Sequence, residues 1–329
     1  MYMYHMGTKK RYLVIPYVTV ILLSLLFCFS TFSVYGSQKK EKNYWRFDSA
    51  KSCKNLKKLR NYRKCTEPVR LSENTWKKEK NYKTLLISGS GQIPHDTFGL
   101  LYEDLKKEAP DGASIYMLDL RQESHGYLDD YTVSLHGGEH NDTNHDLLTA
   151  QVILKEWKDL DSLYGVPTKI HNTNKSFEGA RTKTICSENV CTEKDLAEKA
   201  GFKYIRFSAQ DHHFPQNETV DEFILFFRQL PENSWLHFHC LAGRGRTSVF
   251  MIMYDLMRHP NLSMKRAANR QYMIGGRRIV ASSDEDEWSG KDYIDSDRSR
   301  KLRLFRKYVR ANYKDNYKTS FSKWLEERK

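Results

Sequence analysis

The feature that most limits how this chain can fold is an uninterrupted succession of a strand candidate, a glycine-containing turn and a helix candidate. Residues 235–239 alternate and are apolar enough for a buried strand. Residues 241–245 contain two glycines and predict a turn, and residues 247–258 have the apolar content of a buried helix. A strand that runs through a short turn into a helix is typical of an α/β fold.

The same alternation extends through the middle of the chain. Further strands are predicted at residues 84–90, 114–120 and 203–207. Helical spacing and helix-end signals predict helices at residues 96–108, 146–163, 195–200, 220–230 and 295–311. These elements predict an α/β domain over residues 84–329, with a central, mostly parallel sheet and helices on both faces. Residues 37–83 are polar and lack clear periodicity, so we expect a linker and an irregular N-terminal segment there.

The composition indicates a folded, basic protein. Of the 329 residues, 39% are hydrophobic and 13% aromatic, which provides for a core and argues against disorder. The length suits one large domain, or one domain with a smaller companion. The formal net charge of +13 is compatible with nucleic acid, an anionic membrane or a polyanionic small molecule as partner. No nucleic-acid-binding motif is found, and a solvated lysine-rich face is the simpler alternative.

The first 36 residues have the pattern of an export signal. The basic residues 9–11 precede an uncharged stretch, residues 12–35, whose middle is strongly apolar. The run Val34-Tyr35-Gly36 offers small residues at the positions expected before a cleavage site. We therefore predict a periplasmic or secreted protein. Because the apolar run is long enough to span a bilayer, an uncleaved membrane anchor is the alternative, and no other membrane contact is expected.

The six cysteines separate by position. Cys28 lies in the leader and Cys240 at the start of the glycine-containing turn. The other four form two closely spaced pairs, Cys53 with Cys65 and Cys186 with Cys191. Export would permit disulfides in both pairs, and free thiols are the alternative. Neither pair has the spacing of a common zinc knuckle, so a zinc site is disfavoured.

The string from His239 to Thr247 contains, in order, the residues that a cysteine-dependent phosphatase needs. A phosphate monoester resists nucleophiles because its anionic oxygens repel them. Backbone N–H groups of the turn and the N-terminus of the following helix can neutralise these oxygens, and glycines allow the unusual dihedral angles required. The residues expected to surround the phosphate are Leu241, Ala242, Gly243, Arg244 and Gly245.

Each remaining residue of this motif has a predicted role. Cys240 is the nucleophile, because the positive field of the turn lowers its thiol pKa from the ordinary value of about 8.5. Arg246 can return over the turn and bind two phosphate oxygens as a fork. Thr247 is expected to hydrogen-bond the sulfur, and His239 to orient the turn through backbone contacts. A lone cysteine in a turn is usually inert, but the complete motif is highly specific.

A general acid is expected on the loop after the strand at 203–207. The leaving alkoxide needs a proton, and Asp211 lies on that loop, with Pro215 setting the turn into the next helix. Asp211 would protonate the leaving group and then act as base on the water that releases phosphate from a phosphocysteine. The alternative is that Asp211 only caps a turn, which the cysteine motif makes the weaker interpretation.

Four further stretches carry a resemblance to a known family. They are LISGSGQ at residues 86–92, LRQESHGY at 120–127, LHFHC at 236–240 and RQYMIGG at 270–276. Together with Trp324 near the C-terminus, they resemble the protein-tyrosine-phosphatase-like inositol polyphosphatases, the cysteine phytases of bacteria. The similarity extends over roughly residues 84–326, with a weaker stretch from 43 to 83.

The resemblance implies both a fold and an activity. The fold is a tyrosine-phosphatase-like core with a small β-barrel-like subdomain, which we expect from about residues 43–83 and 121–145. The activity is stepwise hydrolysis of the phosphate monoesters of myo-inositol hexakisphosphate (phytate), with no metal and no cofactor. Cys240, Arg246 and Asp211 match the family's nucleophile, phosphate-binding arginine and general acid.

The resemblance also implies outer substrate contacts. His212 matches the histidine that follows the family's acid and contacts substrate. Lys291 matches a C-terminal lysine that binds peripheral phosphates, and Gln271 either places the hydrolytic water or binds the loop backbone. For the family's N-terminal phosphate-binding arginine, Arg63 is the prediction and Arg46 the alternative.

Two other functions stay open from the sequence. A protein-tyrosine or dual-specificity phosphatase, including a secreted effector, would use the same motif but needs a deep, aromatic-walled pocket. An inositol-phosphate-binding protein with weak activity would keep the basic surroundings, but the intact Cys240, Arg246 and Asp211 argue against it. The positive net charge favours the polyanionic substrate. Nothing in the sequence predicts an oligomeric state.

Overall fold

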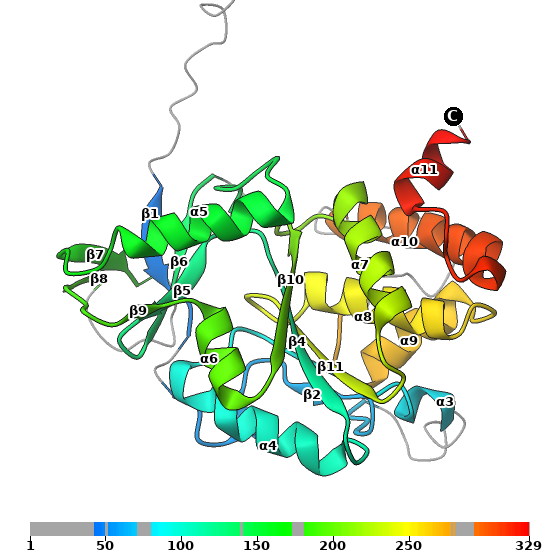
Figure 1. Cartoon of the computed structure of the whole chain (residues 1–329), viewed down its shortest axis with the longest axis horizontal. Helices are drawn as coiled ribbons and strands as arrows, with labels where there is room; N and C mark the ends of the chain where they lie inside the picture. The colour runs from blue at the N-terminus through cyan, green and yellow to red at the C-terminus, as the bar shows by residue number, and fades with distance from the viewer. Residues whose placement is uncertain are drawn as a thin grey trace, which may run out of the picture. The chain divides into compact units, whose positions relative to one another are not determined.

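The predicted central sheet is present, and in this computed structural model it has five strands (Figure 1). Their order is β10-β4-β11-β3-β2; the first four run parallel, and β2 is antiparallel to β3. The strands are β2 (Arg63–Lys64), β3 (Ile87–Ser90), β4 (Ser114–Arg121), β10 (Lys203–Ala209) and β11 (Ser234–His239). The structure describes residues 43–49, 52–70, 80–138, 141–172, 181–277, 279 and 293–328, and all counts refer to these.

Helices cover both faces of this sheet, which confirms the predicted α/β class (Figure 1). The helices are α3 (Lys80–Lys83), α4 (Phe98–Glu108), α5 (Thr149–Asp161), α6 (Glu193–Ala200), α7 (Asn217–Gln229), α8 (Gly245–Arg258), α9 (Met264–Met273), α10 (Tyr293–Asn312) and α11 (Phe321–Glu326). Three short 3-10 turns are η1 (Leu56–Lys58), η2 (His95–Thr97) and η3 (Tyr313–Asp315).

Two hydrophobic cores lie on opposite faces of the five-stranded sheet, because successive strand residues point to alternate sides. Ile115 and Met117 of β4 pack in one core with residues of α4 and α6. Leu118 of β4 and Phe238 of β11 pack in the other core, with residues of α7, α8 and α10. Helix α8 is buried almost all round, which explains why its sequence is apolar on every side.

A second sheet has six strands in the order β8-β7-β1-β6-β5-β9. Its strands are β1 (Tyr44–Phe47), β5 (His125–Leu128), β6 (Tyr131–His136), β7 (Thr168–His171), β8 (Thr182–Ile185) and β9 (Val190–Cys191). The sequence assigned a small subdomain to residues 43–83 and 121–145. The structure takes β1, β5 and β6 from these segments but adds β7 to β9, because the open edges of β1 and β5 pair with β7 and β9. Arg63–Lys64, assigned to the same subdomain, instead pair with β3 in the five-stranded sheet.

Local signals fix the ends of the helices. Helix α6 begins after Thr192, whose hydroxyl accepts a bond from the Asp195 N–H, and ends at Gly201 with φ 107°. Helices α9 and α11 were not predicted, although each has a serine cap, Ser263 and Ser320, whose hydroxyl accepts a backbone N–H. Both are short, so their periodicity carries little signal.

Several expectations concern cysteines and the N-terminus. The four cysteines for which disulfides were an open alternative are free thiols: Cys53, Cys65, Cys186 and Cys191. In the part of the chain that the structure describes, no helix is both long and apolar enough to cross a bilayer. The predicted export signal, residues 1–36, and Lys291 lie outside the described residues.

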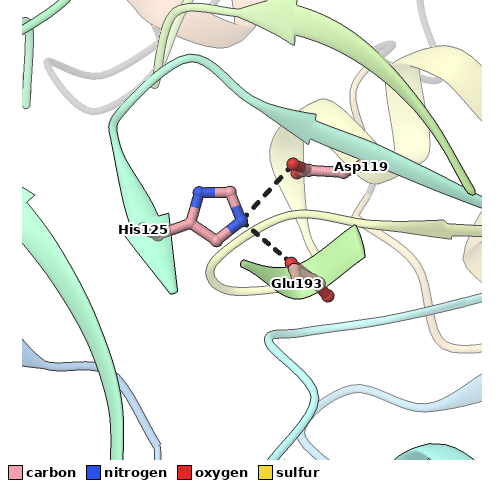
Figure 2. Close-up of side chains that lie close together, drawn as sticks. All are labelled: Asp119, His125 and Glu193. Carbon is pink, nitrogen blue, oxygen red and sulfur yellow. Dashed lines mark hydrogen bonds and ion pairs between the residues drawn. The ribbon is translucent and has the colours of Figure 1, made fainter. Parts of the chain in front are cut away.

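A cluster of buried charges joins the two sheets (Figure 2). His125 of β5 places its Nε2 3.3 Å from Asp119 Oδ2 of β4 and 2.9 Å from Glu193 Oε2 of α6, and all three side chains are fully buried. Burial lowers the pKa of His125, but the nearby carboxylates, Asp119 foremost, outweigh burial and raise the pKa to about 10. The imidazole is therefore charged at neutral pH and balances the carboxylates.

This raised pKa predicts how stability depends on pH. The folded-state pKa of His125, about 10, lies above the ordinary value of 6.5. Its contribution to stability is complete below pH 6.5 and is lost as the pH rises through 10. We expect the free energy of unfolding, measured by urea titration at pH 7 and pH 9, to fall by at most about 1.4 kcal/mol per pH unit.

The matched variant for this measurement keeps the net charge constant. The double substitution His125→Gln/Glu193→Gln removes one buried cation and one buried anion together. It should reduce the pH slope between pH 7 and pH 9. A wild-type stability that is constant or rises over this interval would contradict the assignment of a charged His125.

Candidate active site

Three parallel strands end at the same edge of the five-stranded sheet. In the register of the sheet, His239 at the end of β11 lies opposite Asp119 of β4, and β10 runs parallel to β4 on its other side. The loops that follow these three strands therefore meet at one edge, as is usual for sites on parallel sheets. They bring together Glu123, Asp211 and Cys240, which come from distant parts of the sequence.

The turn after Cys240 is held from outside through three consecutive carbonyl groups. The Leu241 carbonyl accepts from the Gln92 N–H at 3.2 Å. The Ala242 carbonyl accepts from Asn61 Nδ2 at 2.7 Å, and the Gly243 carbonyl accepts from Arg63 Nη1 at 2.6 Å. In a trans peptide the carbonyl and N–H point in opposite directions, so outward carbonyls turn N–H groups toward the centre of the turn. That is the cradle expected for phosphate oxygens.

Glycine is required at the tightest point of this turn. Gly243 has φ 67°, in the left-handed region that side chains disfavour. A Cβ at this position would meet the backbone carbon of Ser90 at 2.3 Å, which is shorter than any real contact. The close approach of the turn to the end of β3 therefore depends on this glycine.

Arg246 is fixed by a two-pronged ion pair. Its Nη1 donates to Glu123 Oε2 at 2.6 Å and its Nη2 to Glu123 Oε1 at 3.0 Å. Nη1 also donates to the Ala209 carbonyl at 3.1 Å, and Asp211 Oδ1 lies 3.3 Å from Nη2. The Nε of Arg246 is buried and has no hydrogen-bond partner among the described residues. It is a donor that an oxygen of a bound phosphate would satisfy.

Cys240 lies at the head of the turn with only 2% of its surface exposed. Burial raises the pKa of its thiol, but the charge of Arg246 and a 3.2 Å hydrogen bond from Thr247 Oγ1 outweigh burial, so the pKa is lowered. His239 is fully buried, with its Nε2 3.2 Å from Glu193 Oε1. Burial lowers the pKa of His239, so this imidazole is neutral, and neither ring nitrogen has a hydrogen-bond partner among the described residues.

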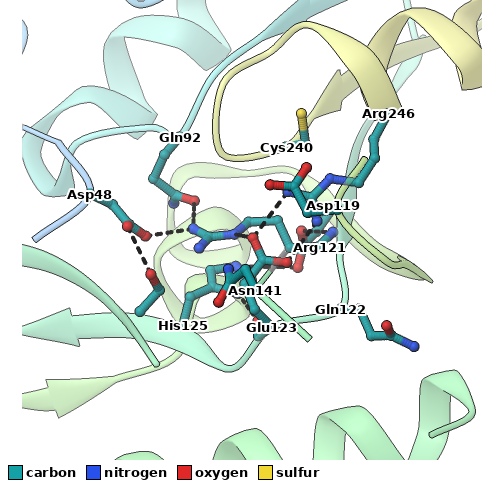
Figure 3. A network of polar contacts seen from close by, with 12 residues as sticks. Asp48, Gln92, Asp119, Arg121, Gln122, Glu123, His125, Asn141, Cys240 and Arg246 are labelled. Carbon is teal, nitrogen blue, oxygen red and sulfur yellow. Dashed lines mark hydrogen bonds and ion pairs between the residues drawn. The ribbon is translucent and has the colours of Figure 1, made fainter. Parts of the chain in front are cut away.

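A network of ion pairs extends from Arg246 to the second sheet (Figure 3). Glu123 Oε1 also accepts from Arg121 Nε at 2.8 Å. Arg121 Nη1 donates to Asp48 Oδ2 at 2.8 Å and to Gln92 Oε1 at 2.5 Å. Asp48 directly follows β1, a strand of the six-stranded sheet. The network therefore links the end of β1 to the turn at residues 240–246, called the phosphate turn below.

The predicted general-acid loop lies beside this turn. The Asp211 side chain is 26% exposed, and its Oδ2 lies 3.7 Å from His212 Nε2. His212 has a left-handed backbone with φ 65°, and about half of its side chain is exposed. Both side chains are thus at the surface next to Arg246, where a substrate can reach them. Arg244 in the turn is also exposed.

Two predicted substrate residues have other positions. Arg63 is buried behind the turn, where its guanidinium binds the Gly243 carbonyl and the Ser248 hydroxyl. It supports the turn instead of facing substrate. The alternative, Arg46, is 15% exposed and lies 3.4 Å from Asp48 Oδ1. Gln271 is fully buried and donates to Tyr82 Oη at 2.6 Å.

Sequence reasoning missed two functional neighbours. Glu123 was noted only within a family-like stretch, although a run of charged residues directly after a buried strand is itself a signal for a site at the sheet edge. Arg298 of α10 was also missed. It is buried, its Nε donates to the His213 carbonyl at 3.3 Å, and a Cβ on Gly245 would meet its guanidinium at 2.5 Å. It therefore contacts both the acid loop and the phosphate turn.

One cluster has the composition of a metal site. Ligand atoms of Asp119, His125 and Glu193 lie within 4.8 Å of one another. A metal needs the neutral imidazole, whereas the raised pKa of His125, about 10, keeps a proton on the ring. Arg206 Nε, 3.2 Å from Asp119 Oδ2, adds a second positive charge. The donors therefore fit an ion-pair network better than a metal site.

The parallel sheet, the inward-facing turn and the thiol beside a fixed arginine are the arrangement of protein-tyrosine-phosphatase-like proteins. Residues 118–258 match the model of the PTP-like phytase family, whose description is inositol hexakisphosphate. Over those residues, which are less than half of the chain, the sequence is similar to this family.

Solved structures of this family are similar over most of the chain. The tandemly repeated PTP-like phytase of Mitsuokella multacida is 32% identical with a TM-score of 0.77, covering 92% of this chain and 52% of its own. A second structure of a PTP-like myo-inositol phosphatase from that organism contains myo-inositol-(1,3,4,5)-tetrakisphosphate. The PTP-like phytase of Bdellovibrio bacteriovorus is 26% identical with a TM-score of 0.63, covering 88% of this chain and 97% of its own.

One similar protein is described as an effector and not as a phytase. The effector protein hopD2 of Pseudomonas syringae pv. tomato is 31% identical over 155 residues, which are 45% of this chain and 32% of the effector. This chain thus spans about half the length of the M. multacida protein and a third of the effector.

The hydrogen bond from Thr247 predicts a change in thiol reactivity. Thr247→Val keeps the shape of the side chain but removes the donor, so the pKa of Cys240 should rise and the alkylation profile should move to higher pH. The measurement is the rate of alkylation by iodoacetamide as a function of pH. Thr247→Ser, which keeps the hydroxyl, is the control and should leave the profile in place. An identical profile for Thr247→Val would show that the bond does not tune the thiol.

Proposed function

We propose that this protein is an inositol polyphosphatase that removes phosphates stepwise from myo-inositol hexakisphosphate through a phosphocysteine intermediate. The observation that carries the proposal is the buried Cys240 with its lowered pKa, next to an arginine that two carboxylates hold in place. The match of residues 118–258 to the PTP-like phytase family model supports the choice of substrate class, and a similar protein is described in complex with an inositol tetrakisphosphate.

In the first step the Cys240 thiolate attacks phosphorus and the ester P–O bond breaks. Arg246 and the N–H groups of the turn neutralise the equatorial oxygens while charge redistributes. Asp211 donates its proton to the departing alkoxide. In the free protein Asp211 lies 3.3 Å from Arg246, so a phosphate that binds this arginine replaces the contact.

In the second step water hydrolyses the phosphocysteine. Asp211, now a carboxylate, takes a proton from the attacking water, and the S–P bond breaks to release inorganic phosphate. The electron pair returns to sulfur, and the hydrogen bond from Thr247 stabilises the thiolate that forms. No step in this sequence needs a metal or a redox partner.

Two observations bear on the choice of substrate. The net charge of +13 favours a polyanion. A secreted effector was one form of the second candidate, a phosphatase that acts on phosphoproteins, and the similarity to the effector protein hopD2 over 45% of this chain is the observation that keeps this candidate. The third candidate, an inositol-phosphate-binding protein with weak activity, is disfavoured because Asp211 lies 3.3 Å from Arg246 and the charges of both residues act on the Cys240 thiol.

The first test compares substrates. Phosphate release is measured with inositol hexakisphosphate and with a phosphotyrosine peptide, using wild type and Cys240→Ser. We expect a higher kcat/KM on the inositol phosphate, and a loss of at least about a thousandfold for Cys240→Ser. Much faster turnover of the peptide would favour the tyrosine phosphatase. Full activity in Cys240→Ser would exclude the covalent mechanism.

A second test addresses the acid. Asp211→Asn should reduce kcat on inositol hexakisphosphate by about a hundredfold, because an alkoxide leaving group needs the proton. The loss should be much smaller on p-nitrophenyl phosphate, whose phenolate leaves without protonation. Steady-state kinetics on both substrates give the two ratios. Equal losses on both would remove Asp211 from the role of acid.

A further inference from the structure

Four buried side chains of β3 and β11 form a continuous series of hydrogen bonds that leads toward the phosphate turn. Trp235 Nε1 lies 2.9 Å from Ser88 Oγ, which in turn lies 2.9 Å from Nδ1 of His237. The Nε2 of His237 lies 3.0 Å from Ser90 Oγ, and Ser90 Oγ lies 2.7 Å from the Gly91 carbonyl. All four side chains are fully buried, so each polar group depends on its neighbour in the series for a partner.

The two ends of this series determine the direction of every bond in it. The indole of Trp235 can only donate, and the Gly91 carbonyl can only accept. Ser90 has one hydroxyl proton, which it gives to that carbonyl, so it accepts from His237 Nε2–H. Burial lowers the pKa of His237 well below its ordinary value, so the ring is neutral and its Nδ1 accepts from the Ser88 hydroxyl. The hydrogen bonds therefore assign the Nε2–H tautomer to His237.

The series ends on a peptide group that supports the phosphate turn. The Gly91 carbonyl and the Gln92 N–H belong to this one peptide group, and the N–H donates to the Leu241 carbonyl at 3.2 Å. The Leu241 carbonyl in turn shares a peptide group with the Ala242 N–H, which points toward the centre of the turn. Consecutive hydrogen bonds polarise and align one another. The side chains between β3 and β11 are thus connected to a donor for phosphate.

We propose that His237 is a positioning residue for the phosphate turn, which as the Nε2–H tautomer aligns the Gly91–Gln92 peptide and through it the Ala242 N–H. The inference rests on the proposed function only in taking an oxyanion as the ligand of the turn. Ser88 and Ser90 point to the same face of β3, and His237 bridges their hydroxyls with its two nitrogens. A neutral imidazole suits this place because it offers one acceptor and one donor in a rigid ring.

The first test determines the tautomer in the wild-type protein. Two-bond correlations between ring protons and ring nitrogens, recorded by NMR with labelled histidine, distinguish the two neutral tautomers and the imidazolium. The signals of His237 are those that disappear in His237→Gln. We expect them to show the Nε2–H tautomer at pH 7. The Nδ1–H tautomer or a charged ring would overturn the proposal.

The second test compares substitutions that keep or remove the donor to Ser90. His237→Gln has an amide long enough to replace Nε2, so it loses only the bond with Ser88 and should bind tungstate, an oxyanion analogue of phosphate, about threefold more weakly. His237→Asn reaches only the position of Nδ1, and His237→Phe keeps a ring without either nitrogen. Both lose the donor to Ser90 and should bind tungstate about tenfold more weakly. Calorimetry gives the affinities.

Two further variants separate alignment from packing. Ser88→Ala removes the donor to His237 Nδ1 without changing Ser90, and should weaken tungstate binding about threefold. Ile115→Val is the control, because it trims a side chain that packs with Trp235 in the same core; it should lower stability and leave the affinity unchanged.

The outcomes also separate this role from the proposed function. If His237→Phe binds tungstate as well as His237→Gln, or if Ile115→Val loses as much affinity as Ser88→Ala, the role is one of packing and the proposal is overturned. Tungstate binding needs no turnover. A wild type that binds tungstate but releases no phosphate from inositol hexakisphosphate would therefore contradict the proposed function and, with the expected order of affinities, still support the positioning role of His237.

Discussion

The ion pair between Arg246 and Glu123 is the interaction on which the site depends. A buried guanidinium is costly unless its charge is matched, and removing one partner of such a pair costs roughly 3–5 kcal/mol. Glu123 meets this requirement with both oxygens, at 2.6 and 3.0 Å. The pair also joins the loop after β4 to the start of α8, so the cation that would bind phosphate is oriented before any ligand arrives. Such preorganisation is what electrostatic catalysis requires.

The need to match every buried charge also explains why the two sheets are joined by ion pairs and not only by apolar packing. Glu123 is shared with Arg121, and Arg121 is bound by Asp48, which also accepts from the Ser134 hydroxyl of β6 at 2.8 Å. Around His125 a second set of carboxylates is balanced by the imidazolium. Each charge is compensated by the next one, so the second sheet cannot move away without leaving a buried charge unpaired.

The sequence predicted best those elements that are determined by residues close together along the chain. The strand–turn–helix around Cys240 is contiguous, and the α/β class follows from strong periodicity in the segments of the central sheet. Strands β7 to β9 of the six-stranded sheet were missing from the predicted subdomain because they are short and lie far along the chain from their partners, as Cys191 does from Tyr127. Glu123 escaped prediction because its role follows from the register of β4 and β11. Arg63 was assigned to substrate from the resemblance, whereas in the structure it is buried and donates to the Gly243 carbonyl of the turn.

Chemistry and substrate choice therefore belong to different parts of this chain. In the proposed function, the turn at residues 240–246 surrounds one phosphate and would treat every monoester alike. Discrimination has to come from groups outside the turn. The segment at residues 49–66, which has no periodicity, is positioned for that role since Asn61 and Arg63 bind the turn directly. A segment that supports the turn from behind can change in charge without altering the chemistry, which allows specificity to vary on a constant catalytic frame.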